Sequence, residues 1–289
     1  MGEINISFSQ IRTNNSSVTT PSIEKSDLEN DVSIFSLDKG SGDDKKVLTK
    51  EEKKAQKAAE KAERERIANT SDGIIQGGRQ GHDAGDCWLL AQMNSMAKTD
   101  WGKKALSEAI TKDDSGNYII HFKGVDKDIK ITQKEFNKAQ KSSSYSTGDA
   151  DALLYELAVE RHFEETNLNE GSIHGNNLAG EDSLQYLLTG HRGRETDQIQ
   201  TMEIVLKAMG ENPENNNNIS ATYIYEDKNP DNVKDAHHAM SVQRVILNDK
   251  GEIDKIVVLN SYTPDNPETL SYKQFKNNLE LFGYVIESK

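Results

Sequence analysis

The chain contains a single cysteine, Cys87, and this residue sets the strongest limit on how the chain can fold. One thiol can form neither an internal disulfide nor a cluster of thiolates around a metal ion, so stability must come from a packed apolar core. A chain of 289 residues is long enough to bury such a core as one large or two small domains. The apolar content of only 34% indicates, however, that part of the chain does not join that core.

Composition divides the chain into four regions. Residues 1–48 are rich in Ser, Thr, Asn and Asp without a sustained hydrophobic period, and we expect a disordered tail there. Residues 49–70 consist mainly of Lys, Glu, Arg and Ala with no apolar stripe, which predicts a charged helical spacer exposed to solvent on every side. The remaining two regions, residues 71–196 and 197–289, carry the apolar segments and form the predicted body.

The two regions of the body differ in their hydrophobic pattern. Residues 71–196 contain several helix-length apolar segments, one of which begins at Cys87, and two short alternating runs that flank Gly124 and predict a β-hairpin. Residues 197–289 begin with one helical segment and continue with alternating apolar runs separated by turn residues. The expected fold class is therefore α+β, with a mostly helical first lobe and an antiparallel β second lobe.

The charge of the chain excludes two classes of partner. The formal net charge is -13, and an acidic body repels both nucleic-acid phosphates and anionic membrane surfaces. The N-terminus lacks the basic start and continuous apolar core of a secretory signal, and no later segment is apolar for long enough to span a bilayer. We therefore expect a soluble protein without a membrane span, either cytoplasmic or exported without a recognisable signal peptide.

The neighbours of Cys87 point to chemistry rather than to packing alone. A lone cysteine is usually a small buried apolar residue, but Cys87 lies between the Gly-rich "QGHDAG" and an apolar helical segment. At a helix N-terminus, unpaired N–H groups and the helix dipole favour the thiolate, which is a nucleophile. Such a nucleophile needs a base, and either His237 or His238 opens a β-rich run in the second lobe. Asn260 ends a strongly apolar strand further on.

Three segments, taken in order, resemble a known family. "QGHDAGDCWLLA", "HHAMSV" and "LNSYTPD" resemble the Cys, His and Asn boxes of the papain-like cysteine peptidases, and specifically of the calpain catalytic core. The segments "DALLYELAVERHF", "LAGEDSLQYLLTGH" and "LSYKQFKNNLELFGYVIES" are also similar to that family, so the resemblance covers Ser71 to the C-terminus. It implies a papain-like two-lobed fold and a cysteine endopeptidase that hydrolyses peptide bonds in proteins through an acyl-enzyme intermediate.

The resemblance also implies the role of each catalytic residue. Cys87 is the expected nucleophile, and His238 rather than His237 is the expected general base, because "HAMSV" matches the family's His box at the second histidine. Asn260 is expected to orient the imidazole by a hydrogen bond. Tyr262 stands where the family has a Trp, and its ring can still shield that bond.

The resemblance implies two further features of the site. The side-chain amide of Gln80 and the backbone N–H of Cys87 are the expected oxyanion-hole donors, although the interval between them is one residue longer than in the family, so the loop must bulge. A thiol mechanism requires no cofactor. The family does bind calcium in loops, and Glu181 is the candidate calcium ligand in this chain, although no EF-hand pattern is present.

Two other functions remain open at the level of sequence. One is a catalytically silent calpain-like module that only binds its partner, since a fold can persist without its activity. The other is an acyl transferase of the transglutaminase type, which also uses Cys and His but has Asp as its third residue. Asn260 favours the peptidase, for which protein or peptide substrates are the expected partners.

Overall fold

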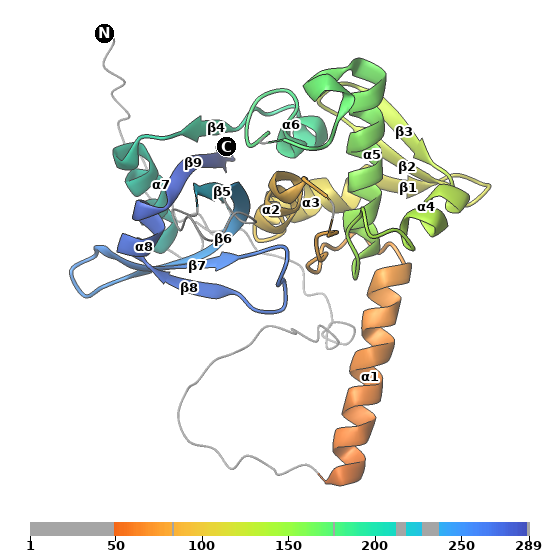
Figure 1. Ribbon diagram of the computed structural model, residues 1–289, viewed down its shortest axis with the longest axis horizontal. Helices are drawn as coiled ribbons and strands as arrows, with labels where there is room; N and C mark the ends of the chain where they lie inside the picture. The colour runs from red at the N-terminus through yellow and green to blue at the C-terminus, as the bar shows by residue number, and fades with distance from the viewer. Residues whose placement is uncertain (1–48, 83, 176, 212–217, 227–236, 288–289) are drawn as a thin grey trace, which may run out of the picture. The chain divides into compact units, whose positions relative to one another are not determined.

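The computed structural model describes the chain in five stretches, residues 49–82, 84–175, 177–211, 218–226 and 237–287 (Figure 1). The tail predicted for residues 1–48 lies outside the described residues. Within them, helices and antiparallel strands combine in an α+β fold, as expected from the sequence. No helix in these stretches is both long and apolar enough to cross a membrane.

The first part of the described chain consists of helices around a small sheet. Its helices are α1 (Lys50–Asn69), α2 (Cys87–Met96), α3 (Asp100–Ala109), α4 (Gln133–Ala139), α5 (Ala150–Thr166), the short 3-10 helix η1 (Leu168–Gly171) and α6 (Leu184–Thr189). The antiparallel sheet has the order β1-β2-β3, and its strands are β1 (Ile110–Lys112), β2 (Tyr118–Phe122) and β3 (Lys127–Ile131). The pair β2–β3 confirms the hairpin predicted around Gly124.

The second part is a six-stranded antiparallel sheet with two helices, α7 (Ile199–Glu211) and α8 (Tyr272–Asn277). The strands are β4 (Arg194–Thr196), β5 (Ile219–Glu226), β6 (His237–Leu247), β7 (Ile253–Leu259), β8 (Glu268–Ser271) and β9 (Leu279–Ile286), in the order β4-β9-β5-β6-β7-β8. Alternating apolar residues predicted β5, β6, β7 and β9, and the structure confirms these four strands.

Two clusters of buried apolar side chains form the core. One is built on α2, α5 and the small sheet, and its large members include the wholly buried Trp88, Tyr155 and Phe163. The other lies between α7, α8 and the large sheet. Helix α2 packs against β5 and β6, and Ala239 of β6 belongs to the first cluster. The start of β6 is therefore placed against the helix that begins at Cys87.

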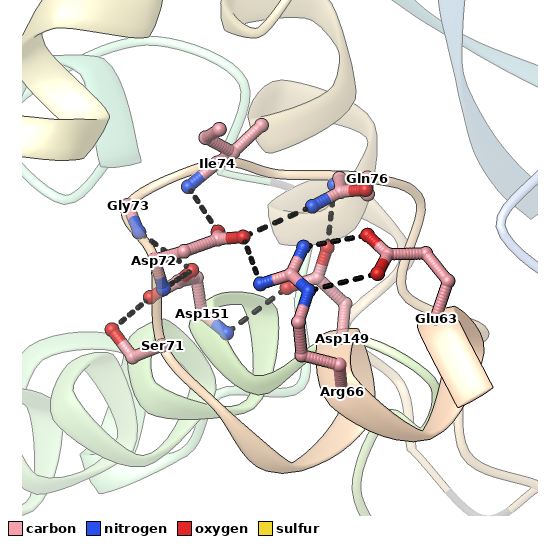
Figure 2. Close-up of polar contacts among 9 residues, drawn as sticks. All are labelled: Glu63, Arg66, Ser71, Asp72, Gly73, Ile74, Gln76, Asp149 and Asp151. Carbon is pink, nitrogen blue, oxygen red and sulfur yellow. Dashed lines mark hydrogen bonds and ion pairs between the residues drawn. The ribbon is translucent and has the colours of Figure 1, made fainter. Parts of the chain in front are cut away.

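Helix α1 is anchored at its C-terminal end. It begins with a capping box between Thr49 and Glu52, and most of its side chains are exposed, as its composition predicts. The expectation that every side is exposed is wrong at Ile67, which is buried. Arg66 forms ion pairs with Glu63 and with Asp72 in the segment that follows (Figure 2). Ile67 and Arg66 thus anchor the C-terminal end of α1, whose other side chains are mostly exposed to solvent.

Carboxylates at the start of α5 hold the segment that leads from α1 toward Cys87 (Figure 2). Asp149 caps α5 and accepts a hydrogen bond from the backbone N–H of Gln76 at 2.5 Å. The Asp151 carboxylate accepts hydrogen bonds from three groups of that segment, the hydroxyl of Ser71 and the N–H groups of Asp72 and Gly73. Both aspartates are 2% exposed, so these contacts are buried.

Candidate active site

Cys87 is the first residue of α2 and touches the large sheet. The helix segment is mostly apolar, with the polar residues Gln92, Asn94 and Ser95, and each of its ten residues is buried. The backbone N–H of Ala239 donates to Cys87 Sγ at 3.4 Å. Cys87 is 8% exposed, so the sulfur lies just under the surface, between α2 and the start of β6.

His238 precedes the residue whose N–H contacts the sulfur. Successive side chains of a strand point to opposite faces, and the two histidines at the start of β6 follow this rule. His238 is 4% exposed, whereas His237 is exposed and its Nδ1 lies 2.7 Å from Glu280 on β9. The structure therefore buries the side chain of His238, and not that of its neighbour, one residue before the N–H that contacts Cys87.

Asn260 fixes the tautomer of His238. The Oδ1 atom of Asn260 lies 2.8 Å from His238 Nε2 and accepts the backbone N–H of Tyr262 at 2.9 Å. Because that N–H can only donate, the Asn260 atom it meets is an oxygen, so Nε2 must carry the proton that it shares with Asn260. The Nδ1 atom of a neutral His238 ring is then unprotonated and can accept a proton.

Two aromatic rings enclose the imidazole. Tyr262 stacks on His238 with ring centroids 4.9 Å apart and an angle of 15° between the planes. Tyr225 of β5 meets the same imidazole edge-on at 6.1 Å. Tyr262 is 36% exposed, so its ring separates the imidazole from solvent on one side. A low-polarity cover of this kind strengthens the hydrogen bond between His238 and Asn260.

Gln80 connects the loop ahead of Cys87 to the residue after Asn260. Its backbone N–H donates to the Ser261 carbonyl at 2.9 Å, and its side-chain oxygen accepts the Ser261 hydroxyl at 2.8 Å. Its Nε2 donates to the Ala84 carbonyl at 2.7 Å across a turn. The amide nitrogen carries two hydrogens, and within the described part of the chain one of them is left for an oxyanion after the Ala84 bond is made.

The protonation state of Cys87 differs from the expectation. The helix N-terminus predicts a stabilised thiolate, but burial raises the pKa of the Cys87 thiol, and the negative charge of Asp86 adds to this effect. The N–H of Ala239 acts in the opposite direction without cancelling the cost of burial. The expectation was wrong because β6 covers the sulfur, a contact that no local sequence pattern reveals.

The loop of residues 173–175, which no sequence motif marks, is hydrogen-bonded to residues next to the nucleophile. The indole N–H of Trp88 donates to the Ile173 carbonyl at 2.8 Å, and the backbone N–H of Gly85 donates to His174 Nδ1 at 2.8 Å. Gly175 N–H in turn donates to the Gly85 carbonyl at 3.2 Å. The residues around His174 carry no recognisable motif, and their partners lie far away in the chain, so no sequence signal could have identified this loop.

Glu181, the candidate calcium ligand, forms an ion pair with Arg192. The carboxylate that a calcium ion would need is therefore paired with the guanidinium of Arg192. Among the residues that the structure describes, no group of three or more His, Cys, Asp or Glu side chains has the arrangement to hold a metal ion. The catalytic candidates do not depend on Glu181 for any contact described above.

Comparison with known proteins adds no further information on function, because neither a protein-family model nor a curated protein matches the chain. The geometry around Cys87, His238 and Asn260, together with the three sequence boxes, is therefore the basis for assigning a function.

Proposed function

We propose that the protein is a calpain-like cysteine endopeptidase with a papain-like two-lobed fold, in which Cys87, His238 and Asn260 form the catalytic triad. The observation that carries the proposal is the hydrogen bond from His238 Nε2 to Asn260 Oδ1, because a neutral ring that has its proton on Nε2 can accept a second proton at Nδ1. The contact between Cys87 Sγ and the N–H of Ala239 supports it, since that N–H is one residue from the imidazole.

Peptide cleavage at this site proceeds in two stages. His238 Nδ1 takes the thiol proton as Cys87 Sγ forms a bond to the peptide carbonyl carbon, and the carbonyl oxygen becomes an oxyanion. The backbone N–H of Cys87 and the second amide hydrogen of Gln80 are the proposed donors to that oxyanion. His238 then protonates the leaving amine as the C–N bond breaks, which leaves a thioester on Cys87.

The second stage releases the enzyme. His238 takes a proton from water, and the resulting oxygen attacks the thioester carbonyl. The C–S bond then breaks as His238 returns the proton to the sulfur, which gives a carboxylic acid, the free thiol and a neutral imidazole. Because burial raises the pKa of the Cys87 thiol, the nucleophile forms when His238 removes the proton during attack, rather than resting as a preformed thiolate. His238 must therefore act as a base in both stages.

Two alternatives predict different behaviour of the thiol. A silent binding module needs no link between the reactivity of Cys87 and the presence of His238. An acyl transferase of the transglutaminase type needs an Asp where this chain has Asn260, and it would transfer the acyl group to an amine rather than to water. The contact of the Asn260 amide oxygen with His238 favours the peptidase over the acyl transferase.

Labelling of the single thiol tests the proposal. Wild-type protein, His238→Ala and His237→Ala are treated with iodoacetamide near neutral pH, and the adduct is followed by intact mass, with Cys87→Ala as the blank. We expect labelling about 100-fold slower in His238→Ala, because its base is gone, and an unchanged rate in His237→Ala. Equal rates in wild-type and His238→Ala, with both proteins folded, would exclude a catalytic pair and favour the silent module.

A further inference from the structure

The peptide bond between Ala84 and Gly85 is held at both of its polar ends. The Ala84 carbonyl accepts a hydrogen bond from Gln80 Nε2 at 2.7 Å, and the Gly85 N–H donates to His174 Nδ1 at 2.8 Å. A peptide unit is planar, so its carbonyl and its N–H can only rotate together. Gln80 and His174 are therefore coupled through one rigid group, although they are far apart in the chain.

The imidazole of His174 lies directly against the backbone of Gly85. A Cβ atom at Gly85 would overlap His174 Nδ1 and lie 3.1 Å from the ring carbon Cγ, so only a glycine lets the ring come close enough to accept this N–H. The Gly85 carbonyl accepts the N–H of Gly175 at 3.2 Å. Both backbone polar groups of Gly85 thus bind the loop of residues 173–175.

The backbone around His174 is held in one conformation. The side-chain nitrogen of Asn169 donates to the carbonyls of Ser172 and His174, each at 2.6 Å, and the Ser172 hydroxyl oxygen accepts the N–H of His174 at 3.1 Å. Asn169 and Glu170 have φ values of 48° and 57°, in the left-handed region that residues other than glycine rarely adopt. Strain of this kind persists only where the surroundings enforce it, and it is common near functional sites.

The bonds of the Gln80 side chain make its orientation depend on this peptide. Its oxygen accepts the Ser261 hydroxyl at 2.8 Å, and one hydrogen of its Nε2 is directed to the Ala84 carbonyl. Because the amide group is planar, these two bonds also set the direction of the second Nε2 hydrogen, the proposed oxyanion donor. Rotation of the peptide would release the first hydrogen and let the second turn away from an oxyanion.

We propose that His174 is a positioning residue for the oxyanion hole of the candidate active site. Its Nδ1 holds the N–H of the peptide whose carbonyl orients the Gln80 amide. Because the Gly85 N–H can only donate, the His174 ring fills this role with Nδ1 unprotonated. The inference rests on the proposed function, since it acts through an oxyanion donor. It requires no contact between His174 and a substrate.

Binding of the tripeptide aldehyde acetyl-Leu-Leu-leucinal to the full-length protein tests this role. The Cys87 thiol adds across the aldehyde C=O bond, so that sulfur bonds to carbon, the proton goes to oxygen, and that oxygen takes the place of the oxyanion. We expect His174→Leu to weaken binding about tenfold, a part of the roughly 100-fold cost of losing an oxyanion donor outright. His174→Asn should bind as wild-type, because its Oδ1 stands near the position of Nδ1. His191→Leu, at another exposed histidine, is the matched control.

Two further measurements separate this role from a general loosening of the site. Alkylation of Cys87 by iodoacetamide forms no oxyanion, so it should proceed at the wild-type rate in His174→Leu. In a Gln80→Ala background, His174→Leu should weaken aldehyde binding no further, because its effect passes through the missing amide. An undiminished effect in that background would overturn the proposal. Equal weakening in His174→Asn and His174→Leu, or slowed alkylation in His174→Leu, would overturn it as well.

Nuclear magnetic resonance gives a reading that does not require activity. The side-chain NH₂ resonances of Gln80, assigned by their loss in Gln80→Ala, should shift in His174→Leu and keep their wild-type positions in His174→Asn. The two variants both lack the imidazole ring, so the comparison isolates the hydrogen-bond acceptor. Unshifted resonances in His174→Leu would contradict the coupling even in a protein that binds no aldehyde. Failure of this inference is therefore distinct from failure of the peptidase proposal.

Discussion

Asn260 Oδ1 accepts two hydrogen bonds, one from His238 Nε2 at 2.8 Å and one from the N–H of Tyr262 at 2.9 Å. The second bond orients the amide, and the amide then orients the imidazole. The ring comes from the start of β6 and the amide follows the end of β7, so two neighbouring strands of one sheet position the base. The sheet therefore supplies rigidity that a loop could not.

Loss of the Asn260 amide should leave His238 in place but poorly oriented. In Asn260→Ala, we expect kcat/KM for a peptide substrate to fall about 100-fold, mainly through kcat, because a misdirected base costs about this much. Asn248→Ala, which removes an exposed turn amide far from the site, is the matched control. Steady-state kinetics of the two variants checks the prediction, and comparable small losses in both would contradict it.

Tyr262 should support catalysis because its ring stacks on His238, and not because of its hydroxyl group. Tyr262→Ala exposes the bond between His238 and Asn260 to water, and we expect activity to fall about three- to tenfold, the value of one aromatic contact. Tyr262→Phe keeps the ring and should retain wild-type activity. If Phe and Ala lost activity equally, the hydroxyl and not the stacking would matter.

Asp149 should make the stability of the protein decrease as pH rises through the acidic range. Burial raises its pKa to about 6 from a usual 3.8, although the N–H groups of Gln76 and Ala152 oppose this shift. The folded state thus binds the proton more tightly than the unfolded state, so the stabilising contribution is complete below about pH 4 and is lost above about pH 6.

The Asp149→Asn variant isolates this effect, because Asn is also a good N-cap and does not titrate. We expect the free energy of unfolding of wild-type, minus that of the variant, to fall by about 2 kcal/mol between about pH 4 and pH 7. Urea unfolding at a series of pH values measures this difference. A difference that grows with pH would show that the N–H donors outweigh burial.

His162 should destabilise the fold in mild acid. It is 2% exposed, neither ring nitrogen has a hydrogen-bond partner among the described residues, and it packs edge-on against Phe122. Burial lowers the pKa of His162, so its contribution is complete above the unfolded pKa of about 6.5 and is lost as pH falls through the lower folded value.

Replacement of His162 by Leu removes both the titration and the unpaired ring nitrogens. Relative to wild-type, His162→Leu should gain stability as pH falls from about 7 to about 5. His191→Leu, at an exposed position, is the control. Urea unfolding at both pH values measures the free energy of unfolding of each protein. An equal response of wild-type and His162→Leu to acid would contradict this explanation.

Local patterns predicted the elements that carry the candidate site, and tertiary contacts account for what they missed. The apolar run after Cys87 predicted α2, and the alternation from His237 onward predicted β6. Both predictions were possible because hydrophobic periodicity is a property of the segment itself. Helices α3 and α4 were not predicted, since each is short and only partly buried. The roles of the site residues remain predictions.

The direction of the Cys87 pKa and the partner of Glu156 could not be read from the sequence. Both depend on contacts that form only in the folded chain, with Ala239 for the sulfur and with Ser146 for the Glu156 carboxyl group. A helix N-terminus is a local feature, whereas its burial under β6 is set by the whole fold. Burial of the thiol raises the Cys87 pKa more than the N–H groups at the helix N-terminus lower it.

Digestion of an unfolded protein by wild-type and Cys87→Ala, followed by mass spectrometry of the products, tests the proposed peptidase most directly. Because Cys87 is the only cysteine, this variant removes the nucleophile without leaving another thiol. We expect fragments to accumulate with time in the wild-type and His237→Ala reactions and to be absent with Cys87→Ala. The same fragments from Cys87→Ala, or none from wild-type, would contradict a catalytic role for this thiol.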